Sequence, residues 1–302
     1  MQLPLVSVII TTFNRKNLLE NAVESVANQT YENVEIILID DCSIDKDYKF
    51  LAKYNVYIHY NELNVGLSAS RNKGINLSRG DLIAFLDDDD VILPNKIEEQ
   101  VELFNNDKTL DVAYCGVMRR YKEHRVYKYP SLSGSIYPEV LRGCPGPVHS
   151  LMIKRKCFDE IGLFDERLEQ FEDFDLWVRL SKKYKFDYVD KCLVVYNYHS
   201  NQMTKKYKEI LSARDYLLDK YAGDYLLNKR FLYVQLRRQI SLCAIYCDYG
   251  LFYKYLFRTI KAFPFNVTLY IHLLLAVSSK KMHRKIIVHF GNKNLAPGMT
   301  SL

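Results

Sequence analysis

Four adjacent aspartates, Asp87 to Asp90, are the residues whose type and spacing most directly suggest chemistry. They follow a short apolar run at residues 82–86, which is typical of a buried strand. Neighbouring carboxylates repel one another, so they need a cation or hydrogen-bond donors beside them. Mg²⁺ and Mn²⁺ bind through one or two carboxylates and complete their shells with phosphate oxygens and water. The run therefore predicts a site for a metal–diphosphate complex, with an acidic turn that caps the next helix as the alternative.

A second acidic motif, FEDFDLWVRL, begins at residue 171. Glu172 and Asp173 stand at the start of a predicted helix, where the positive end of the helix dipole favours anions. A carboxylate at the mouth of a cleft can act as a general base. The alternative is that Asp173 is only a helix N-cap.

The elements that must position these residues alternate in type over the first 115 residues. Continuous apolar runs predict strands at residues 6–11, 34–39, 57–60 and 82–86, and the periodicity predicts helices over 16–27 and 68–77. Such an alternation is typical of a largely parallel sheet that is covered on both faces. Ligands bind at the carboxyl ends of the strands in such sheets. We therefore expect the polar clusters at 11–14, 40–43 and 87–90 to meet in one crevice.

The rest of the chain is predicted more coarsely. The pattern indicates strands or a hairpin over 113–129, a loop-rich stretch over 130–147, and a buried strand over 148–153. A loop and helix over 171–180 and a late strand over 193–198 follow, and the chain reads as helical from 205 to about 290. We expect two domains, residues 1–204 and 205–302.

Composition excludes several classes of protein. With 48% hydrophobic and 26% charged residues, the chain can bury a sizeable core and is not disordered. Its 7 cysteines form no CxxC pair, which disfavours a disulfide framework or zinc ribbon and favours a reducing compartment. The apolar start is short and has no basic region ahead of it, so we interpret it as a strand and not as a signal peptide.

The charge is unevenly distributed. Residues 1–204 carry 25 Lys or Arg against 31 Asp or Glu, whereas residues 205–302 carry 17 against 5. The longest uncharged stretch, residues 262–279, is interrupted by Pro264, Asn266 and His272, so it is a poor spanning helix. Flanking lysines suit a helix that lies in a membrane interface. A helical subdomain with basic outer faces, or nucleic-acid binding, are the alternatives.

Five segments, in this order, resemble the successive motifs of the family 2 inverting glycosyltransferases, which have the GT-A fold. The segments are VSVIITTFNR, EIILIDDCS, NVGLSASRNKGI, GDLIAFLDDDD and FEDFDLWVRL. The resemblance covers roughly residues 5–200, about two thirds of the chain. It implies an α/β, GT-A-like fold with a mostly parallel central sheet flanked by helices, followed by a C-terminal helical region.

The resemblance also implies a nucleotide-sugar site. Residues 11–15 would form the pocket for base and ribose, with Phe13 stacking on the base and Asp41 bonding its edge. A glycine at position 66 would let the backbone approach the diphosphate, and Arg71 would bind phosphate oxygens. The alternative for Arg71 is a local ion pair on the helix surface. The donor-binding residues expected in this way are Thr11, Phe13, Arg15, Asp41, Asn64, Gly66, Arg71, Asp87 and Asp88.

For the metal and the chemistry, the family's Asp-x-Asp motif maps to Asp87 and Asp89. Asp89 is the expected metal ligand, Asp87 would bond ribose or metal-bound phosphate, and Asp88 is the substitute if the register shifts by one. His199 would approach the diphosphate or the metal, with a structural histidine as the alternative. By the same match, Asp173 is the catalytic base and Glu172 orients the acceptor hydroxyl.

The activity implied is a metal-dependent (Mn²⁺ or Mg²⁺), inverting transfer of a sugar from a nucleoside-diphosphate sugar, with UDP-sugar favoured. The acceptor would be a glycan or lipid-linked hydroxyl in capsule, O-antigen or other surface polysaccharide (lipopolysaccharide) synthesis. We expect a cytoplasmic chain, peripheral on the inner face of the cell membrane through its C-terminal region, with no nucleic-acid partner and with a homo-oligomer left open. A nucleotidyltransferase of similar fold and a non-catalytic partner subunit are the alternatives, although TTFNRKN lacks the glycine-rich loop that a nucleotidyltransferase usually shows.

Overall fold

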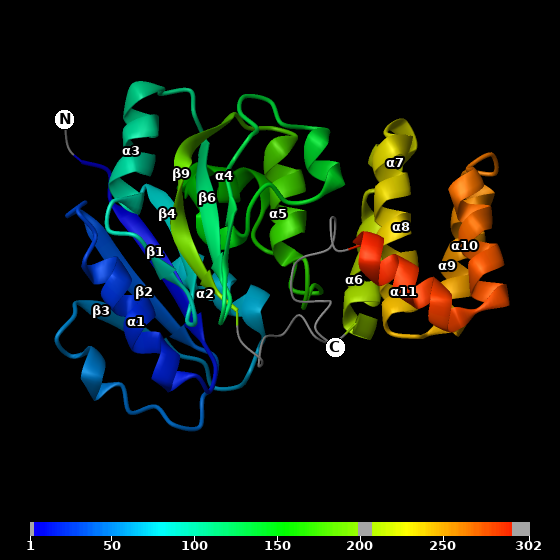
Figure 1. Ribbon diagram of the computed structural model, residues 1–302. Helices are drawn as coiled ribbons and strands as arrows, with labels where there is room; N and C mark the ends of the chain where they lie inside the picture. Colours follow the sequence, from blue (N-terminus) through cyan, green and yellow to red (C-terminus); the bar gives the residue numbers. More distant parts are fainter. Residues whose placement is uncertain (1–2, 199–206, 292–302) are drawn as a thin grey trace. The chain divides into compact units, whose positions relative to one another are not determined.

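The computed structural model describes residues 3–198 and 207–291 (Figure 1). The chain divides into two compact units, Met1–Met203 and Thr204–Leu302. The first unit is an α/β layered structure, and the described part of the second is helical. The expected α/β fold with a C-terminal helical region is confirmed.

Nine strands form one sheet within residues 3–198. They are β1 (Val6–Thr12), β2 (Val34–Asp40), β3 (Val56–Tyr60), β4 (Leu82–Asp87), β5 (Val91–Ile92), β6 (Val112–Arg120), β7 (Arg125–Lys128), β8 (Leu151–Lys154) and β9 (Phe186–Asn197). The helices of this unit are α1 (Lys16–Ala27), α2 (Leu67–Leu77), α3 (Lys96–Asn106), α4 (Arg155–Ile161) and α5 (Glu172–Ser181). Three short 3₁₀ helices are η1 (Lys49–Leu51), η2 (Glu139–Arg142) and η3 (Val148–Ser150).

The strand order places the carboxyl ends of several strands at one edge of the sheet. The order is β3-β2-β1-β4-β8-β6-β9-β5, with β7 paired to β6. β1 is parallel to β2 and β4, and β6 is parallel to β9. Because β8 is antiparallel to both β4 and β6, these two strands also run in one direction. In this register Thr11 lies opposite Asp87 and Thr12 opposite Asp40.

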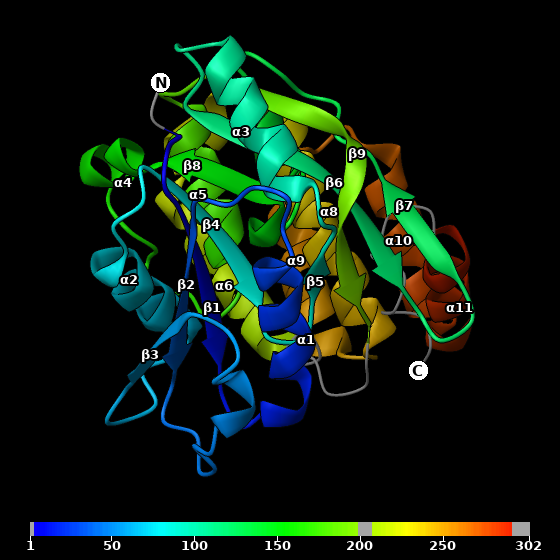
Figure 2. The same ribbon diagram turned by 90° about the vertical axis from the view of Figure 1, so that its left-hand side faces the viewer.

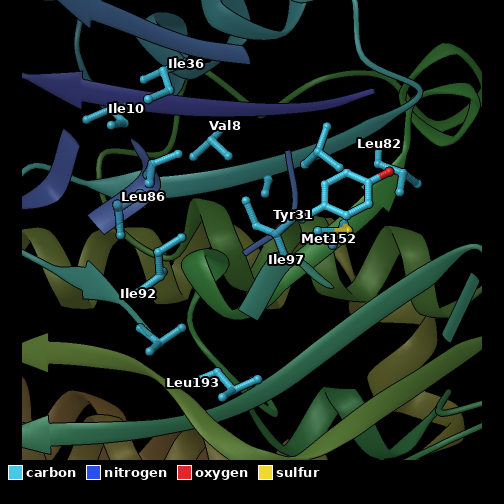
Figure 3. Packing of buried hydrophobic residues seen from close by; sticks show 14 of the residues in the cluster. Val8, Ile10, Tyr31, Ile36, Leu82, Leu86, Ile92, Ile97, Met152 and Leu193 are labelled. Carbon is cyan, nitrogen blue, oxygen red and sulfur yellow. The ribbon is translucent and has the colours of Figure 1, made fainter. Parts of the chain in front are cut away.

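One face of the sheet is covered by α1 and α3. α1 packs on β1 and β2, and α3 packs on β6 and β9. Figure 3 shows residues of the resulting cluster, among them Val8, Ile10 and Ile36 from alternate positions of β1 and β2. Figure 2 shows α1, in blue, beside β5. This cluster is the hydrophobic core that holds the strand ends in place.

The opposite face is covered by α2, α4 and α5. A Cβ atom at Gly74 of α2 would lie 2.4 Å from Ile9 Cγ2, so only a glycine lets this helix approach β1 so closely. Further along the sheet the ring of Phe85 contacts those of Phe158 and Phe164 edge to face, at 6.2 and 5.3 Å between ring centroids. Close packing therefore holds both α2 and α4 against this face of the sheet.

Two predicted strands differ from those observed. The strand predicted over 148–153 begins only at Leu151, because residues Val148–Ser150 form η3. Pro147 precedes this turn, and its carbonyl accepts hydrogen bonds from the amide and the hydroxyl of Ser150 at 3.0 and 2.6 Å. The late strand is longer than predicted and starts at Phe186, because pairing with β6 along its length overrides its mixed polarity.

The C-terminal unit consists of helices in its described residues. They are α6 (Tyr207–Lys220), α7 (Ala222–Leu227), α8 (Lys229–Ile245), α9 (Tyr249–Ala262), α10 (Val267–Ser278) and α11 (Lys280–Gly291). Over the described residues, none of the helices is both long and apolar enough to cross a bilayer.

Candidate active site

The four aspartates run from Asp87, the last residue of β4, through the turn that leads into β5. Thr12 Oγ1 donates to Asp88 Oδ2 at 2.7 Å, and Arg15 Nη1 donates to Asp89 Oδ2 at 2.9 Å and to Asp88 Oδ1 at 3.2 Å. The residue that caps α3 is Asn95, so the alternative of an acidic helix cap is wrong.

Burial raises the pKa of Asp88 to about 7, and burial with the neighbouring aspartates raises the pKa of Asp90 well above its ordinary value. The run is thus a buried acidic turn that is only partly compensated.

His149 of η3 lies between two of these aspartates, and the sequence interpretation had missed it. Its Nδ1 is 3.6 Å from Asp87 Oδ2 and its Nε2 is 3.5 Å from Asp90 Oδ2, and the side chain is 1% exposed. The ring stacks on that of Tyr196 of β9, with 5.5 Å between centroids. Both imidazole nitrogens and Asp90 Oδ2 are buried and lack a hydrogen-bond partner among the described residues. The available signal was a polar, metal-ligating histidine inside the apolar run 148–153, which was predicted as a buried strand.

These partnerless buried atoms fit a divalent cation. Among the described residues, Asp87, Asp90 and His149 form the group whose ligand atoms lie close enough together to share one ion. An imidazole with carboxylates suits Mn²⁺ better than Mg²⁺, which prefers oxygen alone. The metal set expected from sequence was Asp89, Asp87 and His199. Of these, Asp87 belongs to the group, Asp89 pairs with Arg15, and His199 lies outside the described residues.

Arg71 joins the aspartate turn to the second acidic motif. Its Nη2 donates to Asp87 Oδ1 and its Nη1 to Glu172 Oε1, both at 2.7 Å, and the side chain is 2% exposed. The alternative of a local ion pair on the helix surface is therefore wrong. Both terminal nitrogens are bound to carboxylates, which differs from the expectation that Arg71 meets phosphate. Burial opposes ionisation of Asp87, but the Arg71 charge holds the pKa of this carboxyl well below its usual range.

Asp173 lies in the first turn of α5. The helix is preceded by Phe171, which has a left-handed backbone (φ 63°) and stands at the N-cap position, so the alternative that Asp173 is the cap is wrong. Asp173 Oδ1 accepts a hydrogen bond from the amide of Phe174 at 2.7 Å. Burial, with the Glu172 carboxylate beside it, raises the pKa of Asp173 to about 7. This value suits a group that accepts a proton near neutral pH.

Asp41 shapes the loop that leads into α2. Its Oδ1 and Oδ2 accept from the backbone amides of Val65 and Gly66, each at 2.9 Å, and its carbonyl accepts from the side-chain Nδ2 of Asn64 at 3.3 Å. Gly66 has φ +88°, a conformation that favours glycine and starts the helix. Asp41, which was expected to bond the base edge, thus has both carboxylate oxygens engaged by backbone amides of the loop between β3 and α2.

The end of β1 and the turn after it hold the remaining predicted donor residues, Thr11 and Phe13. Thr11 is buried, whereas Phe13 is 44% exposed and open to a stacking partner. Asn14, which the sequence interpretation did not single out, has a left-handed backbone and accepts the Ile44 amide through Oδ1 at 2.9 Å. This bond holds the turn after β1 against the loop after β2.

A mostly parallel sheet whose strand ends gather an acidic turn, with a second carboxylate pair at a helix start, is the arrangement that the resemblance to GT-A glycosyltransferases implied. The sequence model of the family described as "Glycosyl transferase family 2" matches residues 7–164, and that of "Glycosyltransferase like family 2" matches residues 145–232. The chain belongs to glycosyltransferase family 2 and is a glycosyltransferase. The resemblance noted in the sequence is confirmed.

Known proteins similar to this chain include two named as uncharacterized glycosyltransferases. That of Methanocaldococcus jannaschii, MJ1057, is 28% identical in an alignment 302 residues long, and the match covers 93% of this chain and 96% of the relative. That of Rickettsia felis is 34% identical in an alignment 218 residues long, and the match covers 67% of this chain but 36% of the relative. Staphylococcus aureus TarS 1–349, solved in complex with UDP-GlcNAc, shares the fold with a TM-score of 0.67 at 16% identity, over 96% of this chain and 92% of TarS 1–349.

Proposed function

We propose that this glycosyltransferase moves a sugar from a nucleoside-diphosphate sugar to an acceptor hydroxyl with inversion, and that the donor is a UDP-sugar. The observation that carries the proposal is the ion-pair chain Asp87–Arg71–Glu172, which links the acidic turn to the carboxylate beside Asp173. The TarS complex with UDP-GlcNAc supports the choice of nucleotide.

In the proposed reaction, Asp173 accepts the proton of the acceptor hydroxyl. The hydroxyl oxygen forms a bond to the anomeric carbon, the bond from that carbon to the diphosphate oxygen breaks, and the nucleoside diphosphate leaves with the electron pair. Glu172 orients the hydroxyl. Thr11, Phe13, Arg15, Asn64 and Gly66 line the donor side, and Asp41 and Arg71 hold that side in shape.

A bound Mn²⁺ or Mg²⁺ would neutralise the charge that builds on the departing diphosphate. Asp87 and Asp89 are the proposed ligands, with Asp88 as the alternative in register. His149 and Asp90 add partnerless ligand atoms beside Asp87. His199 keeps the role predicted from sequence, toward the metal or the diphosphate.

For the acceptor we propose a glycan or lipid-linked hydroxyl, in the synthesis of capsule, O-antigen, lipopolysaccharide or another surface polysaccharide. The basic C-terminal unit, residues 205–302, supports a peripheral location on the inner face of the cell membrane, where such acceptors are built. The proposal includes a homo-oligomer. It does not include a nucleic-acid partner.

A panel of nucleotide sugars, incubated with the protein and Mn²⁺, tests the activity. We expect slow release of a nucleoside diphosphate from one donor, and faster release when a glycan acceptor is added. Release of pyrophosphate would favour the nucleotidyltransferase alternative, which membership of the family disfavours. No release from any donor would favour a non-catalytic partner subunit.

A further inference from the structure

Helix α10 carries an exposed apolar surface. Val267, Tyr270, Ile271, Leu274 and Val277 are all exposed, and their spacing of three or four residues places them on one side of the helix. We call these five residues the α10 stripe. Leu274 is 69% and Val277 71% exposed, whereas Leu269 and Ala276, on the packed side, are fully buried. One side of the helix thus packs against the rest of its unit, and the other side exposes apolar side chains to solvent.

The loop before α10 extends this surface. Phe265 is 95% exposed, two residues before the helix begins. α10 itself contains no charged residue. A large exposed apolar surface on a folded protein marks a contact with a partner or a membrane.

The surroundings of the stripe are basic. Asp248 is the last acidic residue of the chain, and residues 249–302 carry 8 Lys or Arg and no Asp or Glu. Lys261 precedes the stripe, and Lys280 and Lys281 follow it at the start of α11, all exposed. Lysines beside bare apolar side chains are complementary to anionic headgroups above acyl chains.

The length of the helix decides how it would meet a bilayer. α10 has 12 residues, which is about 18 Å at a rise of 1.5 Å per residue. A bilayer core is about 30 Å thick. The helix would therefore lie in the plane of the interface.

We infer that the α10 stripe, with Phe265 and the flanking lysines, is a docking surface for an anionic lipid bilayer. The stripe enters the boundary between headgroups and acyl chains, and the lysines lie against lipid phosphates. The inference deepens the proposed membrane location by naming the surface responsible. Vesicle binding does not depend on catalysis. If the proposed sugar transfer is not found, the binding experiment still tests this inference.

Vesicle flotation of the full chain tests the inference. We expect binding to phosphatidylcholine vesicles with about 30% phosphatidylglycerol, and weak binding to phosphatidylcholine alone. L274E/V277E should reduce the bound fraction by about tenfold or more, because it places charge in the apolar boundary. K280A/K281A should weaken binding to anionic vesicles by about 25-fold and leave the weak neutral binding unchanged.

Matched variants in the same unit serve as controls. L226E/L227E changes exposed leucines at the end of α7, and K208A/K229A removes exposed lysines elsewhere. Both should float within about twofold of wild type, and circular dichroism should show unchanged helix content in all four variants. The inference is overturned if L274E/V277E floats like wild type, or if L226E/L227E loses as much binding. It is also overturned if the chain ignores vesicles and sediments as an oligomer that L274E/V277E dissociates, since the stripe would then be a contact between copies.

Discussion

Arg71 and Glu172 form a buried ion pair, with 2.7 Å between Nη1 and Oε1, across 101 positions of sequence. The same guanidinium holds Asp87 at the end of β4. One side chain on α2 thereby fixes the distance between the acidic turn and the start of α5. In the proposed reaction this is the distance between the leaving group and the proton acceptor. Small changes in this distance would therefore slow the transfer.

Replacing the proposed base should remove transfer and leave donor binding. Asp173→Asn keeps the shape of the side chain but cannot take a proton, so transfer should fall about 10²–10⁴-fold. Donor affinity, measured by calorimetry, should stay within about twofold of wild type. Glu169→Gln, an exposed change just before α5, is the control. Near wild-type transfer by Asp173→Asn would contradict the assignment.

The pH dependence of transfer should follow Asp173. Its pKa is raised to about 7, and a base works only when deprotonated, so kcat should fall as pH drops below about 7 and level off above it. Because burial also raises the pKa of Asp88 to about 7, the rate must be measured at saturating donor. A flat kcat between about pH 5 and 8 would speak against Asp173.

Breaking the Arg71 link should cost stability. Arg71→Ala leaves Asp87 and Glu172 charged and partly buried without their cation, which should lower the free energy of unfolding by about 3–5 kcal/mol. Arg79→Ala removes the exposed pair with Glu35 and should cost below about 1 kcal/mol. Urea denaturation measures both. If the two variants lose the same free energy of unfolding, the buried ion pairs of Arg71 do not stabilise the fold more than an exposed pair does.

Asp89 should control donor binding that depends on metal. In Asp89→Ala we expect the gain in donor affinity on adding Mn²⁺ to disappear, because the proposed ligand is lost. Calorimetry with and without Mn²⁺ measures this gain, with Asp45→Ala as an exposed acidic control. If Asp89→Ala keeps the full gain, Asp89 does not hold the ion.

His149 should matter for the metal as well. His149→Gln removes the buried imidazole between Asp87 and Asp90, so Mn²⁺ affinity should fall about 10–100-fold. His59→Gln, on β3, is the control. If Mn²⁺ binds His149→Gln as it binds wild type, the imidazole only packs against the aspartates.

Local pattern was sufficient to predict much of the fold. The apolar runs at β1, β2 and β4 and the periodicity of α1 identify their elements because burial on both faces of a parallel sheet leaves a direct signature in sequence. The same logic placed Asp87 at a strand end. The helical C-terminal region followed from pattern alone, as did its excess of basic residues.

Tertiary structure decided which of these groups touch. The pairing of β5 with the end of β9 determines that Asn197 lies beside the acidic turn, where its backbone amide donates to Asp90 Oδ1 at 2.8 Å. The 3₁₀ turn after Pro147 turns His149 toward Asp87 and Asp90, whereas the sequence predicted a plain strand there. Sequence by itself determined the residue types and the elements, because helix and strand periods are local properties. It could not determine the Arg71–Glu172 pair or the raised pKa of Asp173, because both arise from burial by segments that are distant in the chain.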